Sequence, residues 1–189
     1  MDGNFRSEEK KELLKLARKT IRLFLESGKV EYPSYHNPEY KKKMGVFVTL
    51  HMDNALRGCI GYPLPQKPLS EAIVDNAIAS ATQDPRFEPV SLPELEAIDI
   101  EISVLTVPKK ITQVSEIEVG RDGIIISKGF NRGLLLPQVP LEQSWTLDQY
   151  ISYGCMKAGL PGDEWKRGVE IETFQAIIFS EKHQSQVGE

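Results

Sequence analysis

The sequence predicts a two-lobed α+β fold in which a mostly antiparallel, curled sheet is flanked by helices. Three observations support this fold class. Strand-like runs come in hairpin pairs, a segment of helical period follows each pair, and the same order recurs in both halves of the chain. Strands joined by tight turns are antiparallel, whereas a parallel sheet needs a long crossover between its strands. The parallel alternative therefore fits the pattern less well.

The overall composition is that of a globular protein. The chain has 189 residues, of which 40% are hydrophobic and 26% charged, close to the average of folded domains. No apolar run approaches the roughly 20 residues that span a bilayer, and the acidic start MDGNFRSEEKKELL does not resemble a signal peptide. A net charge of −4 gives no general attraction to nucleic acid or an anionic membrane. We therefore expect a cytoplasmic protein that binds neither.

The N-terminal part predicts one long helix followed by a loop. Residues 7–28 carry an apolar stripe at helical spacing, with a serine that can cap the start and a glycine suited to the end. The basic residues lie away from that stripe, so we expect a solvated face, with a weak anion-binding face as the alternative: Lys10, Lys11, Lys15, Arg18, Lys19 and Arg22. Residues 29–45 contain two prolines and predict a long loop.

The first repeat, about residues 46–107, is predicted as strand, strand, helix, short helix and strand. Asp53 and Asn54 separate the two strands, and both residue types tolerate the positive φ of a tight two-residue turn. Ser91 and Glu94 have the spacing of a capping box at the start of the short helix. The expected elements cover 46–52, 55–62, 70–82, the turn from 91, and 99–106.

The second repeat, about residues 123–180, has the same predicted order. Arg57-Gly58 falls on Arg132-Gly133 at an offset of 75, which indicates an internal duplication within one domain that spans residues 1–189. Its expected elements are strands at 123–127 and 132–137, a helix at 146–158, a short turn at 163–166 and one long strand at 169–180. The last residues, EKHQSQVGE, predict a frayed tail.

The segment LRGCIGY at residues 56–62 contains the main candidate for chemistry. Alternation along a strand places Arg57, Cys59 and Gly61 on one face, where neighbours lie roughly 7 Å apart. A guanidinium at that distance favours a thiolate, and the glycines leave room beside it. Cysteine is also among the most buried residue types, so a structural role is the alternative.

The environment of Cys59 depends on how the two strands of the hairpin are paired. A plain two-residue turn sets Val48 opposite Cys59 and Leu50 opposite Arg57, and apolar neighbours of this kind raise a thiol pKa. A shift of one residue sets Thr49 opposite Cys59 and His51 opposite Arg57, which is a more polar environment. The sequence leaves both registers open.

The remaining chemical candidates are few. Asp84-Pro85-Arg86-Phe87 can present a guanidinium and a ring to a groove, or Asp84 can pair locally with Arg86. Cys59 and Cys155 belong to no CxxC pair and the three histidines are isolated, so no metal site or disulfide is predicted. No phosphate-binding, dinucleotide-binding, zinc-protease or hydrolase motif is present, and no cofactor is expected.

Four segments together resemble the AMMECR family in its short archaeal and bacterial form: VFVTLHMDNALRGCIGYPLP, DPRFEPVSLPELEAIDIEISVLT, GRDGIIISKGFNRGLLLPQV and CMKAGLPGDEW. The match runs from about Val46 to Phe179, and the motifs RGCIG, RGLLLPQV and CMKAGLP are distinctive in combination. Glu88 departs from the family, which usually has a second proline there. The resemblance implies a two-lobed α+β fold with internal repeats and a cleft between the lobes near RGCIG. It also implies pathway partners, a dioxygenase-like protein and a radical S-adenosylmethionine protein, but no agreed reaction.

Three hypotheses for function follow. The first is a binding or adaptor module, with arginines that contact anions in a cleft formed by Arg57, Gly58, Gly61, Asp84, Arg86, Arg132 and Gln138. The second is a thiol-dependent enzyme for a small acyl or amide substrate. Cys59 would be its nucleophile, Arg57 would stabilise the thiolate, and His51 or Asp84 would transfer protons. The third is RNA binding, suggested by tyrosines near a lysine run and judged the weakest.

Overall fold

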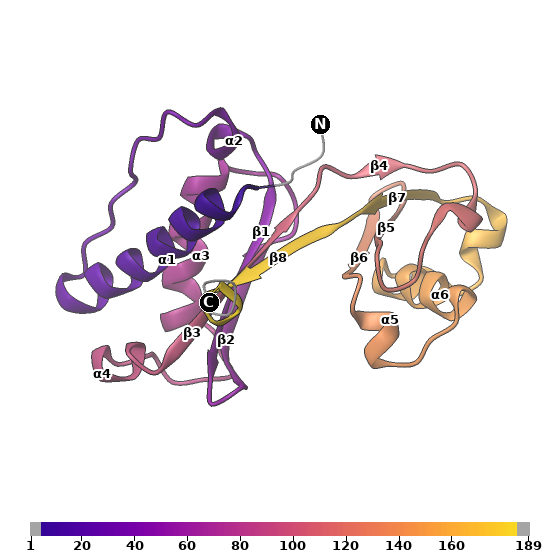
Figure 1. Ribbon diagram of the computed structural model, residues 1–189. Helices are drawn as coiled ribbons and strands as arrows, with labels where there is room; N and C mark the ends of the chain where they lie inside the picture. The colour runs from indigo at the N-terminus through magenta and orange to yellow at the C-terminus, as the bar shows by residue number, and fades with distance from the viewer. Residues whose placement is uncertain (1–4, 185–189) are drawn as a thin grey trace. The chain divides into compact units, whose positions relative to one another are not determined.

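The computed structural model describes residues 5–184, with side chains through 182, and the chain divides into two compact units. Unit 1 comprises the described residues up to 105 and from 177 onward, and unit 2 comprises residues 106–176. The elements of unit 1 are α1 (Ser7–Ser27), α2 (Pro38–Lys41), β1 (Gly45–Met52), β2 (Ala55–Tyr62), α3 (Leu69–Thr82), α4 (Leu92–Leu95), β3 (Ile98–Leu105), β8 (Ala176–Ser180) and α7 (Glu181–Gln184) (Figure 1).

Unit 2 contains β4 (Lys109–Lys110), η1 (Val114–Glu116), β5 (Gly123–Lys128), β6 (Asn131–Leu135), α5 (Val139–Glu142), α6 (Leu147–Lys157), η2 (Glu164–Arg167) and β7 (Glu170–Phe174). The predicted α+β class with antiparallel strands is confirmed. The strands form two four-stranded sheets, however, rather than one curled sheet. Their strand orders are β2-β1-β3-β8 and β4-β7-β5-β6.

The two units share one topology. In each, a hairpin is followed by a helix and then by a strand that pairs antiparallel with the first strand of the hairpin. The fourth strand of each sheet comes from elsewhere in the chain: β8 follows β7 but joins the first sheet, and β4 follows β3 but joins the second. This shared topology is consistent with the internal duplication inferred from the sequence. The duplication stays a prediction, and so does the assignment of residues 1–189 to a single domain.

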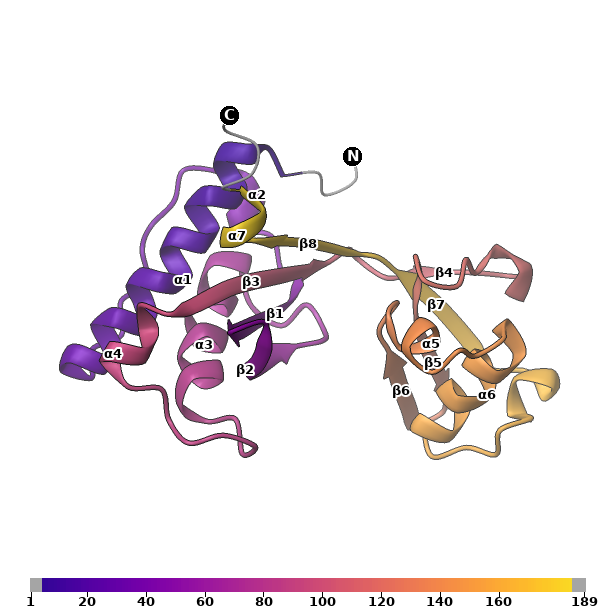
Figure 2. The same cartoon turned by 60° about the horizontal axis from the view of Figure 1, so that its bottom comes forward.

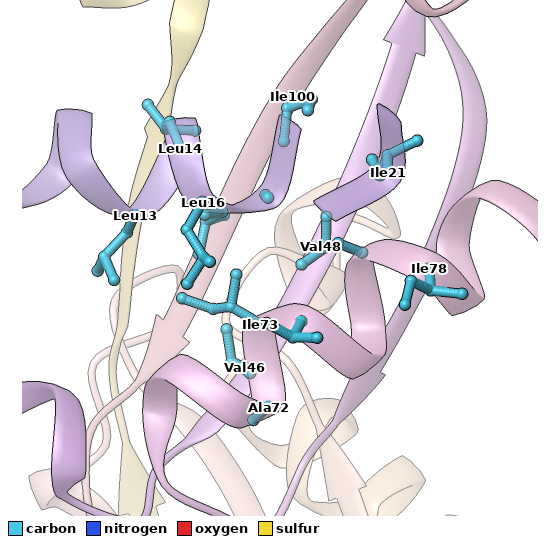
Figure 3. Close-up of a cluster of buried hydrophobic side chains, with 14 of the residues drawn as sticks. Leu13, Leu14, Leu16, Ile21, Val46, Val48, Ala72, Ile73, Ile78 and Ile100 are labelled. Carbon is cyan, nitrogen blue, oxygen red and sulfur yellow. The ribbon is translucent and has the colours of Figure 1, made fainter. Parts of the chain in front are cut away.

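In unit 1, α1 and α3 pack on one face of the sheet (Figure 2). Alternate residues of the strands point into this layer, including Val46 and Val48 of β1 and Ile100 of β3, and all three are fully buried. Figure 3 shows them against Leu13 and Leu16 of α1 and against the apolar residues of α3. Burying such side chains contributes about 1.5–3 kcal/mol each, so this layer holds β1 and β3 in place.

Unit 2 has a smaller core of the same kind. Ile124 and Ile126 of β5 pack against Ile151 and Cys155 of α6, and all four are fully buried. The hydroxyl of Tyr150 in α6 donates hydrogen bonds to backbone oxygens of Asp122, Leu135 and Leu136. Cys155 is therefore a core residue, and burial raises the pKa of its thiol.

Several sequence-based predictions need correction. The strand expected at 169–180 is interrupted at Gln175, where the backbone passes from β7 to β8. There the Gln175 carbonyl accepts from Thr106 N–H, and its own N–H donates to Thr106 Oγ1. The tail expected to fray instead forms α7 over Glu181–Gln184, while residues 185–189 lie outside the described residues.

The expected solvated face of α1 is also only partly correct. The guanidinium of Arg18 is bonded to Glu181 of α7 and to the carbonyl oxygens of Leu95 and Ile98. It therefore fastens the C-terminal helix to unit 1. Arg22 pairs with Glu96. Among residues 5–184, no helix is long and apolar enough to cross a membrane.

Candidate functional site

The β1–β2 hairpin settles the register question with a bulge. Asp53 and Asn54 both have positive φ, 52° and 63°, which confirms the two-residue turn and pairs His51 with Leu56. The pairing then shifts by one residue, so that Leu50 faces Gly58 and Thr49 faces Cys59. The expectation that Val48 faces Cys59 is therefore wrong. Arg57 is the extra residue of the bulge, so it faces neither Leu50 nor His51.

Cys59 has a polar neighbour as a result. The hydroxyl of Thr49 donates a hydrogen bond to Cys59 Sγ over 3.3 Å. The cysteine is a free thiol and is half-buried rather than enclosed in the core. The surroundings of Cys59 therefore differ from the wholly apolar environment expected of a structural cysteine.

The outer edge of β2 at Cys59 is closed by polar groups from the loop after α3. Asp84 Oδ2 accepts the N–H of Cys59 over 2.8 Å, whereas Ser80 Oγ accepts the N–H of Ile60 over 2.9 Å and donates to the carbonyl of Val48, the partner of Ile60 on β1. Arg86 donates to the carbonyl of Cys59 over 3.4 Å. An exposed strand edge can pair with another strand through such groups, and here they are already occupied. Recognition at Cys59 therefore has to use a face of the sheet rather than its edge.

Asp84 and Arg86 form a local ion pair, the second of the two alternatives for this segment. The carboxylate of Asp84 is almost completely buried and receives two guanidinium N–H groups over 2.9 and 2.7 Å. These bonds from Arg86, together with the Cys59 N–H, hold the pKa of Asp84 well below its ordinary range. Asp84 thus stays ionised and bonded, which makes it unsuited to the proton-transfer role considered for it.

Arg57 is occupied elsewhere and does not act on the thiol. Its guanidinium donates to Glu94 Oε1 over 3.1 Å and to the carbonyl of Glu88 over 2.9 Å. Glu94 also closes the predicted capping box with Ser91 at the start of α4. With its side chain only 13% exposed, Arg57 ties the edge strand to α4. The guanidinium that contacts Cys59 is that of Arg86, and it donates to the backbone carbonyl oxygen rather than to the thiol.

The two glycines of the motif are required for packing. A Cβ on Gly58 would lie 2.2 Å from the carbonyl oxygen of Ser80, and one on Gly61 would lie 2.3 Å from the ring of Phe47. Gly58 therefore lets α3 approach the edge strand, and Gly61 lies beneath an aromatic ring. The open space that the sequence suggested beside the thiol is filled in both directions.

The other two predicted site residues belong to unit 2. Arg132 in β6 pairs with Glu172 of β7 over 3.0 Å and is about half exposed. Gln138 is exposed and precedes α5, where its carbonyl accepts from Leu141 and Glu142 N–H groups. Arg57 to Gly61, Asp84 and Arg86 thus come together in unit 1, whereas Arg132 and Gln138 do not belong to that cluster. The cleft expected between the lobes stays a prediction.

One face of the first sheet carries the candidate site. We call it the Cys59 face, and it consists of the half-buried residues Phe47, Thr49, Cys59, Gly61, Glu101 and Ser103. Thr49 lies between Cys59 and Glu101 in one cross-strand row, and Phe47 lies between Gly61 and Ser103 in the next. His51 occupies the same face of β1 two residues from Thr49. Diagonal neighbours of this kind are about 7–8 Å apart, and among the described residues the only hydrogen bond to Cys59 Sγ comes from Thr49.

Sequence reasoning missed Ser80 and the pairing of Glu94. Ser80 is a buried polar residue in the otherwise apolar inner face of α3, and it also donates to the carbonyl of Val48. A serine at such a position could have signalled a hydrogen bond to a strand edge. No group of three or more His, Cys, Asp or Glu side chains suited to a metal occurs within residues 5–184.

The fold and this site define a class: a two-unit α+β protein with one open sheet face organised around a bulged Arg-Gly-Cys-Ile-Gly hairpin. The AMMECR1 family model matches residues 14–179 of the chain. The protein MK0488 of Methanopyrus kandleri is 49% identical over 93% of this chain and 89% of its own length. The protein MJ0810 of Methanocaldococcus jannaschii is 47% identical over 89% and 88%. The chain therefore belongs to the AMMECR1 family.

A solved structure is similar as well. The crystal structure of the uncharacterized protein PH0010 from Pyrococcus horikoshii is 45% identical in sequence, with a TM-score of 0.79 over 94% of this chain and 93% of that one. The resemblance drawn from the four quoted segments is thus confirmed.

Proposed function

We propose that this protein is a binding or adaptor module that presents the Cys59 face to a partner protein. The observation that carries the proposal is the contrast between the two sides of the first sheet. One side is buried under α1 and α3. The other side carries the half-buried side chains of the Cys59 face, among them the ring of Phe47 and the polar groups of Thr49 and Glu101, and this mixture of apolar and polar groups suits contact with another protein. The partners implied by the family resemblance, a dioxygenase-like protein and a radical S-adenosylmethionine protein, are the first candidates. The cytoplasmic location expected from the composition of the chain is part of the proposal.

The contacts of the three arginines alter the anion-binding role expected for them. Arg57, Arg86 and Arg132 are each paired with a carboxylate of their own unit. Arg86 in unit 1 and Arg132 in unit 2 are each about half exposed, so each can offer N–H groups to a second partner. Arg57 is largely buried, and replacing it would disturb the fold rather than test binding.

Charge reversal on the Cys59 face tests the proposal. The side chain of Glu101 is half-buried and makes no hydrogen bond or ion pair with the described side chains of residues 5–182, so Glu101→Lys should leave the fold intact. The two candidate partner proteins are purified and immobilised, and binding of the full chain is measured. We expect Glu101→Lys to weaken binding at least about tenfold, because it adds a misplaced charge at an interface.

The matched control is Glu26→Lys, an equal change of charge at an exposed position near the end of α1. It should bind the partners as the unchanged protein does. Equal affinity of all three proteins would show that the Cys59 face is not the recognition surface. Failure of both partners to bind the unchanged protein would remove them as candidates.

The second candidate function is thiol-dependent catalysis, favoured by the hydrogen bond from Thr49 to Cys59 and by the nearby guanidinium of Arg86. The Cys59 thiolate would attack the carbonyl carbon of an acyl or amide substrate and expel the protonated amine or alcohol. Water would then hydrolyse the resulting thioester. We rank this second because no base bonds to Cys59 Sγ among the described side chains. His51 lies at a diagonal position only.

The pH dependence of alkylation separates the two functions. Cys155 is fully buried and its pKa is raised, so the folded protein should react with iodoacetamide at Cys59 alone. A reactive nucleophile requires an apparent pKa clearly below the free value of about 8.5. A value at or above 8.5, or the same profile for Thr49→Val and the unchanged protein, would count against catalysis.

A further inference from the structure

The outer edge of the second sheet is open at β6, whereas the corresponding edge of the first sheet is closed at Cys59. β6 and β2 are the outermost strands of their sheets, and each is the second strand of a hairpin (Figure 2). Outermost strands present N–H and C=O groups that another strand can bond, and proteins usually cover them. In β2 the groups of Cys59 are bonded to Asp84 and Arg86. The equivalent groups of β6 lack such partners.

The turn of the β5–β6 hairpin determines which groups of β6 point outward. It has two residues, of which the first, Gly129, has a positive φ of 61° and the second does not, as in a type II′ turn. The pair that closes such a turn, Lys128 with Asn131, is hydrogen-bonded, and bonded and non-bonded pairs then alternate along the ladder. Arg132 and Leu134 are in non-bonded pairs, so their N–H and C=O groups point away from β5. No other described residue bonds to these four groups.

The chain after α6 explains why this edge is open. After α3 the chain continues along β2 and supplies the groups that close it. α6 ends differently, because Gly159 has a φ of 76° and the N–H of Leu160 bonds to the carbonyl of Cys155. This is a Schellman motif at the end of a helix, and it turns the chain back, so that Gly162 lies beside Ser152 of α6. The segment that would close the edge of β6 is therefore folded against its own helix.

The side chains that flank the open groups indicate which sequence fits them. Arg132 and Leu134 project from the same face of β6, and Leu134 is half-buried. The side chain of Arg132 is 46% exposed and reaches Glu172 through Nη2 alone, so its other N–H groups can bond a second carboxylate. Opposite charges that face each other across two strands stabilise the pairing, and like charges destabilise it. An acidic residue therefore fits opposite Arg132, and an apolar residue fits opposite Leu134.

We propose that β6 binds an extended segment of a partner protein, which joins the second sheet as a fifth strand antiparallel to β6. Its backbone pairs with the outward N–H and C=O groups of Arg132 and Leu134. In this pairing the apolar residue opposite Leu134 precedes the acidic residue opposite Arg132 by two positions. The main-chain bonds supply affinity and the two side chains supply specificity. The site lies in unit 2, and it requires neither the Cys59 face nor the function proposed for that face.

The probe is the seven-residue peptide acetyl-TTVTETT-amide, in which valine fits opposite Leu134 and glutamate opposite Arg132. Binding to the full chain is followed by amide chemical shifts. We expect millimolar peptide to shift the amides of residues 131–135. The peptide TTVTKTT should bind about fivefold more weakly, because its lysine faces Arg132. A peptide methylated at the valine and glutamate nitrogens should not bind, because those two N–H groups are the ones that point to β6.

Two substitutions locate the interaction. Leu134→Pro removes an outward N–H that the ladder does not use, and it should abolish binding. Arg132→Glu should reverse the preference, so that the lysine peptide binds more tightly than the glutamate peptide, and it gives an independent answer if Leu134→Pro does not fold. The matched control is Lys110→Glu, the same change of charge on β4 at the opposite edge of the sheet, which should change nothing.

Four results would overturn the proposal. The first three are absence of shifts at residues 131–135, equal binding of the methylated peptide, and an unaltered preference in Arg132→Glu. The fourth is self-association of the unchanged chain, measured by sedimentation, that Leu134→Pro abolishes. That result would show that the edge of β6 pairs with a second copy of this chain rather than with a partner protein.

Discussion

The hairpins β1–β2 and β5–β6 occupy the same position in the topology of their units, but the first has Cys59 where the second has Leu134. In both, the glycine after the arginine contacts the end of the following helix: Gly58 contacts Ser80 and Gly133 contacts Ala158. Only the first hairpin has a bulge. Cys59, which the bulge places opposite Thr49, corresponds by sequence offset to Leu134, which pairs with the buried Ile125.

The comparison separates the features that both units need in order to fold from the features that occur in unit 1 alone. Close packing of a helix against an Arg-Gly strand occurs in both units, so it is a property of the fold. The bulge, the thiol and the carboxylate at residue 84 occur in unit 1 alone, and Gly159 stands at the position that corresponds to Asp84. The candidate site therefore lies in the features that the second unit lacks. The arginine that both units share is not one of them.

The largest effect is expected from the two glycines. Gly58→Ala places a Cβ 2.2 Å from the Ser80 carbonyl oxygen, and Gly133→Ala places one 2.4 Å from the Ala158 nitrogen. Backbone has to move in both cases, so each should lose about 3 kcal/mol in the free energy of unfolding. Denaturant titration measures the loss, and amide hydrogen exchange assigns it to one unit.

The control for these glycines is Gly129→Ala. Unlike Gly58 and Gly133, this glycine has a positive φ, 61°, and no atom lies within 4 Å of an added Cβ, so only backbone strain of about 1–2 kcal/mol is expected. If all three variants lost the same amount, close helix packing would not be the common role of Gly58 and Gly133.

A smaller effect is expected at Asp84, the group that unit 2 lacks. Asp84→Asn removes the ion pair with Arg86 but can still accept the Cys59 N–H, so we expect a loss of about 2 kcal/mol at pH 7. The pKa of Asp84 is lower in the folded chain than its ordinary value of 3.8. Its contribution is therefore complete above about pH 5 and is lost as the pH falls through the folded pKa.

Urea unfolding at pH 7 and pH 3 checks this dependence. The difference in stability between the unchanged protein and Asp84→Asn should shrink toward pH 3. A difference that stays constant would show that the carboxylate charge is not what holds the edge of β2. Arg86→Gln offers a second variant, because it removes the same ion pair from the exposed side.

The smallest effects are expected from the paired arginines, and they should differ between the units. Arg57→Ala removes a largely buried side chain with hydrogen bonds to Glu94 and Glu88, and it should cost about 1–2 kcal/mol. Arg132→Ala breaks a half-exposed pair with Glu172, which should cost less than about 1 kcal/mol. Thermal unfolding ranks the two variants. Equal losses would mean that the bulge does not give Arg57 its structural role.

Local patterns accounted for most elements of the fold. The apolar stripe of α1, the Asp53-Asn54 turn and the capping box at Ser91 depend on residues close in the chain, and the structure confirms all three. The division into two sheets was not predictable in this way. It depends on where β4 and β8 pair, and these strands join partners far away in sequence.

For the candidate site, the sequence by itself determined which residues are present, and it identified Cys59 within the distinctive RGCIG motif. The tertiary structure decided what surrounds the thiol. The extra residue of the bulge, Arg57, makes Thr49 rather than Val48 the cross-strand neighbour of Cys59. Asp84 and Ser80, more than 20 positions from Cys59 in the sequence, bond to the backbone of β2 beside it. A register shift of one residue reverses the face of every later side chain, and bonds across such separations leave no local pattern. The thiol was therefore visible in the sequence, whereas its environment was not.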